Sequence, residues 1–307
     1  MKGKKLLHLP LLLSVVVIGV IIGIGFIKAQ TNPPALVVHP SNLEINLTPG
    51  APTKGTIFLK NTTDKPVTIQ TSIKNFTAQG EEGGVDLTSD NTPFSMSSWV
   101  RITPEKIDIQ AQQEVAFSYT ITPPLSAEPG GHFGSIVFAT IPSTVNAGAG
   151  SAISQEIAAL ILAKIPGNVK EDALVESLTT EKPFYEFGPV KFVMRVKNQG
   201  DIHVQPFGAI QVKDMLGNKV DTTIPPTNIL PNAVRKIFIS YPHHLLIGKY
   251  TATIVASYGT KNQPLVGSVE FYAFPIRYGI VLLVILIVLL LLRKRIFKAF
   301  KMMATGK

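Results

Sequence analysis

The sequence predicts an all-β protein, with two tandem β-sandwich domains between an N-terminal signal segment and one C-terminal transmembrane helix. Short runs rich in Val, Ile, Thr and Phe alternate apolar with polar residues, as half-buried strands do, and turn residues separate them. Three motifs recur in the same order in the two halves of this region. Two long apolar segments beside basic residues flank the region, and this pattern is typical of membrane topology signals.

Residues 1–30 are predicted to be a signal sequence. Three lysines within the first five residues precede an apolar run from Leu6 to Ile27, and Ile27-Lys28-Ala29 offers a cleavage site. The run is longer than the apolar part of most signals, so an uncleaved membrane anchor is the alternative. In both versions the chain that follows is exported.

Residues 275–292 are predicted to form a transmembrane helix, and residues 293–307 a basic cytoplasmic tail. The apolar run is long enough to cross most of a bilayer, since a helix rises about 1.5 Å per residue. The tail has six basic and no acidic residues, which marks the cytoplasmic side. We therefore expect a single-pass cell-membrane protein with an extracellular ectodomain, or a two-pass protein if the signal is uncleaved.

The charge distribution supports this topology and argues against nucleic-acid binding. The formal net charge is +9, but 11 of the 29 basic residues lie in or beside the two apolar segments. The region between them carries 18 basic and 20 acidic residues. Excess positive charge at the ends of membrane segments is a topology signal and not a basic binding face. The absence of cysteine excludes disulfides and thiolate metal sites.

The repeat divides the ectodomain into two immunoglobulin-like sandwiches, predicted at 34–167 and 172–273, with a short joint at Pro166-Gly167-Asn168. Each half has a strand, a turn containing Asn and Asp, and a return strand, and Asn and Asp side chains stabilise such turns. Three pairs of segments match: Leu59–Val67 with Val196–Val204, Val115–Tyr119 with Ile237–Tyr241, and Gly131–Ala139 with Gly248–Ala256.

The third match bears on the histidine of the Pro-Gly-Gly-His segment. His132 aligns with Lys249, so the position accepts unrelated polar side chains. We therefore predict that His132 is an exposed strand residue. Phe133 and Tyr250 are predicted to pack inward, because side chains alternate along a strand.

No catalytic constellation is found, so we predict a non-catalytic protein without metal or cofactor. The histidines of the ectodomain form no metal-binding spacing, and no nucleophile elbow or phosphate loop occurs. An envelope enzyme remains the least favoured function. The candidate ligand or partner contacts are the single tryptophan and the acidic residues of the loop at 79–90: Trp99, Glu81, Glu82, Asp86 and Asp90.

Both candidates have an alternative explanation. Trp99 could stack on a sugar, but a lone tryptophan more often plugs one end of a sandwich. The acidic loop could bind calcium through its carboxylates, but its spacing fits no known calcium loop. A solvated loop or a loop that contacts a partner is the default interpretation.

The first domain resembles the peptidoglycan-binding domain of the WxL-interacting surface proteins of Gram-positive bacteria. The segments that carry the resemblance are Val38–Ser41, Gly55–Asn61, Ser98–Val100 and Glu128–Gly134. The overall layout is similar too, with a signal, two β domains, one C-terminal membrane helix and a basic tail. The resemblance implies two kinds of partner: peptidoglycan or another cell-wall polymer, and WxL-type or other surface proteins.

The sequence thus predicts a membrane-anchored bacterial cell-surface protein whose ectodomain binds peptidoglycan, surface proteins or both. The alternative is a chaperone-like or surface-assembly module that pairs an edge strand with a client protein. A groove lined by aromatic and polar groups around Trp99 would favour the first function. An exposed strand edge beside apolar surface would favour the second.

Overall fold

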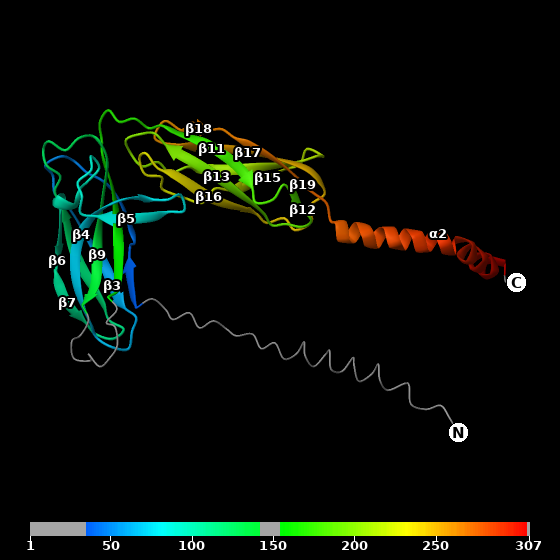
Figure 1. Cartoon of the computed structure of the whole chain (residues 1–307), viewed down its shortest axis with the longest axis horizontal. Helices are drawn as coiled ribbons and strands as arrows, with labels where there is room; N and C mark the ends of the chain where they lie inside the picture. Colours follow the sequence, from blue (N-terminus) through cyan, green and yellow to red (C-terminus); the bar gives the residue numbers. More distant parts are fainter. Residues whose placement is uncertain (1–34, 142–153, 306–307) are drawn as a thin grey trace, which may run out of the picture. The chain divides into compact units, whose positions relative to one another are not determined.

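The structure is a computed structural model that describes residues 35–141 and 154–305. Its strands form four sheets, two in each half, and one long apolar helix, α2, follows the last strand (Figure 1). The predicted all-β class, with two sandwiches and one C-terminal apolar helix, is confirmed. The predicted signal sequence at 1–30 lies outside the described residues.

The first sandwich uses the strands between Leu36 and Ile165. One sheet has the order β1-β3-β8-β6, and the other β2-β10-β9-β4-β5, with β7 also paired to β4. Strand β2 runs parallel to β10, while the pairs β10–β9 and β9–β4 of the same sheet are antiparallel. The elements are β1 Leu36–His39, β2 Asn42–Asn46, β3 Thr53–Asn61, β4 Val67–Gln79, β5 Gly84–Thr88, the short 3₁₀ helix η1 Ser97–Trp99, β6 Val100–Thr103, β7 Lys106–Ile109, β8 Glu114–Ile121, β9 Gly130–Ile141 and β10 Glu156–Ile165.

The second sandwich, between Ala173 and Ala273, repeats most of this topology but has no counterpart of β6. Its sheets have the orders β11-β13-β16 and β12-β19-β17-β14-β15, with β18 also paired to β17, and β12 runs parallel to β19 as β2 does to β10. The elements are β11 Ala173–Thr180, β12 Phe184–Tyr185, β13 Val190–Asn198, β14 Phe207–Asp214, β15 Lys219–Thr223, β16 Val234–Tyr241, β17 Gly248–Tyr258, β18 Gln263–Leu265 and β19 Ser268–Ala273.

The first repeated motif is built around one buried asparagine in each sandwich. In the first, the Asn61 Nδ2 donates to Lys65 O (2.8 Å) and to carbonyls of the segment at 109–110, and Asn61 Oδ1 accepts from Thr63 N. In the second, the Asn198 Nδ2 donates to Ile202 O and Ile229 O, both at 2.8 Å. Both asparagines are fully buried, so they tie the turn to a neighbouring segment in a place that water does not reach.

The third repeated motif is misaligned by one residue in the sequence comparison. Strand β9 begins at Gly130 and β17 at Gly248, and both glycines have positive φ (141° and 101°). His132 therefore corresponds to Tyr250 and not to Lys249. Because side chains alternate along a strand, a slip of one residue exchanges the two faces of the sheet.

The prediction that His132 is exposed is therefore wrong. Its side chain is only 5% exposed, and its ring lies 4.6 Å from the Trp99 ring. Nε2 is 3.0 Å from the carbonyl oxygen of Glu128. Phe133 is also buried, as expected, but on the opposite face of the sheet from Ile136, which belongs to the core between the sheets.

Helix α2 runs from Ile276 to Thr305 and includes the predicted transmembrane segment except Pro275. Residues Ile276–Arg293 have a mean hydropathy of 2.6, and none of them is buried by the rest of the protein. Within the described residues this is the one helix that is long and apolar enough to cross a membrane.

Replacing Asn198 by Ala should destabilise the second sandwich by about 3 kcal/mol, because the carbonyls of Ile202 and Ile229 lose their buried donor. Urea unfolding of the full chain in detergent, followed by circular dichroism, measures the effect. Asn46→Ala is the matched control, because Asn46 is exposed, and should change stability by less than about 0.5 kcal/mol. Equal effects of the two variants would contradict a structural role for Asn198.

Candidate functional site

The candidate site lies over the outer face of the β2-β10-β9-β4-β5 sheet, the face turned away from the first sandwich's core. Phe76, Phe133 and Leu162, from β4, β9 and β10, form a separate apolar cluster there and are no more than 4% exposed. We call these three residues the outer-face cluster. The second sandwich supplies part of its cover, because Leu230 packs against the cluster and the His203 ring lies 5.8 Å from the Phe133 ring.

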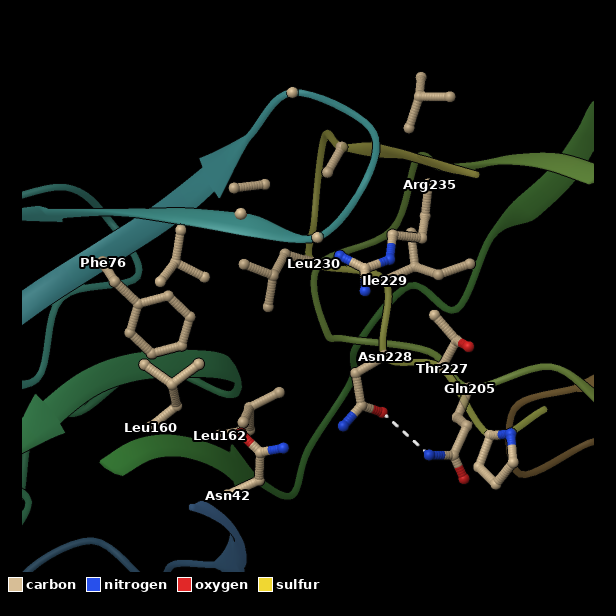
Figure 2. Close-up of a pocket in the computed structure, with 18 of the residues that line it drawn as sticks. Asn42, Phe76, Leu160, Leu162, Gln205, Thr227, Asn228, Ile229, Leu230 and Arg235 are labelled. Atoms are coloured by element: carbon tan, nitrogen blue, oxygen red, sulfur yellow. Dashed lines mark hydrogen bonds between the residues drawn. The ribbon is translucent and has the colours of Figure 1, made fainter. Parts of the chain in front are cut away.

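A pocket of about 320 Å³ remains between this face and the segment at 226–235 of the second sandwich. Its floor is apolar, with Phe76, Leu160 and Leu162, and its opposite wall carries polar side chains among apolar ones such as Ile229 and Leu230 (Figure 2). The polar side chains of this wall are those of Gln205, Thr227, Asn228 and Arg235. We call this space the junction pocket. A pocket that combines apolar surface with convergent polar groups has the features of a binding site.

Arg235 is the unusual residue of the pocket. Its side chain makes no ion pair or hydrogen bond with any other described residue, and Nε is buried without a partner. Burial lowers the pKa of the guanidinium from its ordinary value. A Cβ at Gly83 would overlap the guanidinium, so the absence of a side chain at Gly83 makes room for it. A guanidinium held in this way can donate hydrogen bonds to a carboxylate or a carbonyl oxygen from outside the chain.

The other polar groups of the wall are fixed by contacts across the pocket. Asn228 Nδ2 donates to Glu44 Oε1 of β2 at 2.6 Å, and Gln205 Nε2 donates to Asn228 Oδ1 at 3.3 Å (Figure 2). These bonds join β2 of the first sandwich to two loops of the second. The amide of Asn228 is therefore held in one orientation by its hydrogen bonds, while the Arg235 side chain is uncommitted, that is, without a bonding partner among the described residues.

The free edge of β2 borders the pocket. Leu160 N donates to Ser41 O, and Leu47 N donates to Lys164 O, so residues 41, 43, 45 and 47 turn their backbone groups toward β10. The alternate residues, Asn42, Glu44 and Asn46, therefore turn their N–H and C=O groups away from β10. No described strand pairs with this side of β2, and Asn42 and Glu44 line the pocket. The edge can accept a further strand.

The acidic loop of the sequence analysis is a β-hairpin that binds the second sandwich. Glu81, at the tip between β4 and β5, accepts two hydrogen bonds from the Arg195 guanidinium, one of them 2.8 Å from Nε to Oε2. Its carbonyl oxygen accepts from Lys236 N at 2.8 Å, at the outer edge of β16. The Arg195 hydrogen bond lowers the pKa of the Glu81 carboxyl. We call the contacts of Glu81 with Arg195 and Lys236 the clasp.

The other predicted contact residues are not brought together at the pocket. Glu82 is 74% exposed and 4.0 Å from the Lys236 ammonium, and Asp86 and Asp90 are exposed. Trp99 is partly buried and packs against the core between the sheets. The part of the chain that the structure describes contains no group of three acidic or histidine side chains placed to hold a metal ion.

His203 is buried where the outer-face cluster meets the second sandwich. It is 1% exposed, and neither ring nitrogen has a hydrogen-bond partner among the described residues. Burial, and secondarily the Lys164 ammonium on β10, lowers its pKa from 6.5 to about 3. The imidazole is therefore neutral at ordinary pH, and its protonation opposes the packing of the two sandwiches.

Sequence reasoning missed Arg235 and the apolar floor. The sequence does carry a signal for the floor. Ala159–Ile165 is almost continuously apolar, whereas a strand with one solvent-exposed face alternates apolar and polar residues. Arg235 gives no such signal. It is one of several basic residues at the start of a strand, and only the fold shows which of them lacks a partner.

No family model matches the chain, and no curated protein matches it. Among solved structures it is similar to a chaperone–tip adhesin complex of CFA/I fimbriae, at 12% identity and a TM-score of 0.40, over 78% of this chain and 99% of that chain. It is also similar to the YadV chaperone, at 11% identity and a TM-score of 0.39, over 78% and 100%. A third is the CsuC–CsuE chaperone–tip adhesion subunit pre-assembly complex of Acinetobacter baumannii, at 11% identity and a TM-score of 0.37, over 78% and 100%.

The favoured prediction, peptidoglycan binding, is wrong. It expects an aromatic groove around Trp99 that the residues there do not form, and the similar structures are named as chaperones and chaperone–adhesin complexes. The His132 ring occupies part of the tryptophan surface, and the groove between β4 and β6 is lined by Ser97 and Val100 but not by Trp99. Membership of the WxL-interacting family stays a prediction.

Glu81→Ala should loosen the clasp and speed hydrogen exchange at the Lys236 amide, which donates to Glu81 O and depends on the hairpin remaining docked. Exchange followed by mass spectrometry on the full chain measures it. Glu82→Ala, one residue along the same turn, is the control and should leave exchange unchanged. Faster exchange in the control as well would assign the effect to the turn and not to the ion pair.

Lowering the pH from 7 to 5 should remove about 2 kcal/mol of stability through His203, because its pKa is about 3 in the folded chain and 6.5 when unfolded. Between these values the unfolded chain binds more protons, so stability falls as the pH falls. Urea unfolding at several pH values tests this, with His203→Met as the variant that lacks the effect. An unchanged profile in His203→Met would contradict the assignment.

Proposed function

We propose that this chain is a non-catalytic binding module, attached to a membrane by α2, that holds an extended segment of a partner protein at the cell surface. The observation that carries the proposal is the junction pocket, in which an apolar floor, an uncommitted arginine and a free strand edge meet. The function agrees with the alternative that the sequence left open, a module that pairs an edge strand with a client.

The free edge of β2 supplies the backbone part of the recognition. Asn42, Glu44 and Asn46 offer outward N–H and C=O groups, and a partner strand that pairs with them extends the sheet by one strand. Such pairing depends on the backbone, so it accepts many sequences. Side-chain pockets beside the edge then supply the selectivity.

The junction pocket supplies the side-chain part. A strand beside β2 places alternate side chains over the outer face of the sheet, where Leu160 and Leu162 form the floor. An apolar side chain of the partner would be buried there. An acidic side chain or a carbonyl group would reach Arg235, whose own surroundings provide no partner. The favoured segment is therefore extended, alternately apolar and acidic.

Some of the similar structures also have a protein partner. Two are chaperones in complex with a tip adhesin or tip adhesion subunit, and a third is a pilin in complex with its chaperone. For the present chain we infer a protein partner at the surface from its own edge and pocket. Anchoring by α2 would keep the site near the membrane while the partner is held.

A displayed library of random peptides, selected on the full chain in lipid nanodiscs, tests the proposal. We expect enrichment of peptides with alternating apolar residues and at least one acidic residue. Arg235→Gln should weaken their binding about tenfold or more, because a hydrogen bond to a charged group contributes roughly 1.5–3 kcal/mol.

The strand edge is tested separately with Glu44. Glu44→Pro removes the outward N–H without touching the bonds between β2 and β10, and edge strands tolerate proline in this orientation. It should abolish peptide binding, while Glu44→Gln, which keeps the N–H and an acceptor for Asn228, should retain it. Selected peptides that bind all three variants equally would refute binding at this edge and pocket.

A further inference from the structure

The end of the second sandwich that leads into α2 exposes an unusual amount of apolar side chain. The strand registers bring three connections to this end, because Gly248 pairs with Ala273, the last residue of β19, and Asp214 pairs with Tyr250. The connections are residues 186–189, 214–218 and 242–247. The exposed fractions are 65% at Met215, 81% at Leu216, 61% at Leu245 and 51% at Ile247.

The start of α2 is fastened to the same end. Phe274 N donates to Tyr185 O at 3.0 Å, and Arg277 N donates to Glu186 Oε1 at 2.8 Å. The Phe187 ring lies 5.3 Å from the Tyr278 ring. Only two residues separate β19 from the helix, so a membrane crossed by α2 must begin beside these loops.

The loop at 214–218 is built to present its apolar tip. Asp214 Oδ1 accepts hydrogen bonds from Leu216 N and Asn218 N, both at 2.9 Å, and Oδ2 accepts from Asn218 Nδ2. These bonds lower the pKa of the Asp214 carboxyl and commit its charge to the turn. A Cβ at Gly248 would overlap the Met215 sulfur, so this loop lies against the start of β17.

Two lysines stand at the base of that loop without an acidic partner. Lys213 and Lys219 are paired across β14 and β15, both are exposed, and neither forms an ion pair within the described residues. Like charges directly opposite each other on a sheet repel. An external anion between them would relieve this repulsion, and phosphate headgroups are the anions of a membrane surface.

We infer that this end of the second sandwich lies in the headgroup region of the membrane that α2 crosses. The side chains of Met215, Leu216, Leu245 and Ile247 enter the boundary between headgroups and acyl chains, and Lys213 and Lys219 bind lipid phosphates. The inference rests on the proposed membrane attachment. The occupant of the apolar surface is the outer leaflet, because the helix that begins at this end is the one that crosses it.

The chain has no cysteine, so a single introduced cysteine can carry an environment-sensitive fluorophore. Leu216→Cys and Leu245→Cys report on the proposed contact, and Lys261→Cys, in the exposed turn between β17 and β18, is the control. Each full-length variant is reconstituted into vesicles of phosphatidylcholine and phosphatidylglycerol. Lipids with a nitroxide near the headgroup then quench fluorophores that lie at that depth.

Quenching should be several-fold stronger at positions 216 and 245 than at 261, with a blue-shifted emission. Equal quenching at the three positions would overturn the inference. A fourth variant, Leu286→Cys in α2, separates the two proposals by using lipids labelled deep in the acyl chain. Quenching at 286 without quenching at 216 and 245 would support membrane attachment by α2 but reject the placement of the sandwich loops in the headgroup region. No quenching at 286 would reject both proposals.

Discussion

The rest of the structure depends on one constraint: the β2-β10-β9-β4-β5 sheet has apolar side chains on both faces, so both faces must be covered. One face forms the core with the opposite sheet, as in any sandwich. The other carries the outer-face cluster of Phe76, Phe133 and Leu162, which must be covered because apolar surface in water is costly. The hairpin at 79–84 and the segment at 198–235 supply the cover, and the junction pocket is the space that they leave.

The repeated asparagine turn has one structural role in the first sandwich and two in the second. Asn61 and Asn198 close equivalent turns with equivalent bonds, so the local chemistry is the same in both sandwiches. The turn after Asn198 has an additional neighbour, because Asp201 O accepts a hydrogen bond from Gly131 N of the first sandwich at 2.8 Å. The same turn therefore closes one domain and joins it to the other.

The sequence predicted the class of the fold well, and the site poorly. Alternation, turns and the repeat are local properties, so they identify strands and two sandwiches without a structure. The one-residue slip at Gly130-Gly131 was enough to misplace His132, because adjacent glycines give no hint of which one starts the strand. Arg235 could not be identified at all, since an unpaired charge is defined by what surrounds it in space.

Part of the cover of the outer-face cluster lies later in the chain than the cluster itself. Phe76 and Phe94 contact Phe133 within the first sandwich, but Leu230 and His203 belong to the second, so the surface that these two residues cover stays exposed for some seconds at ordinary rates of synthesis. During that interval the newly made sheet presents an apolar face beside an open strand edge, the combination that promotes aggregation. The order of the two domains along the chain thus makes the newborn protein itself dependent on protection until its second half has been made.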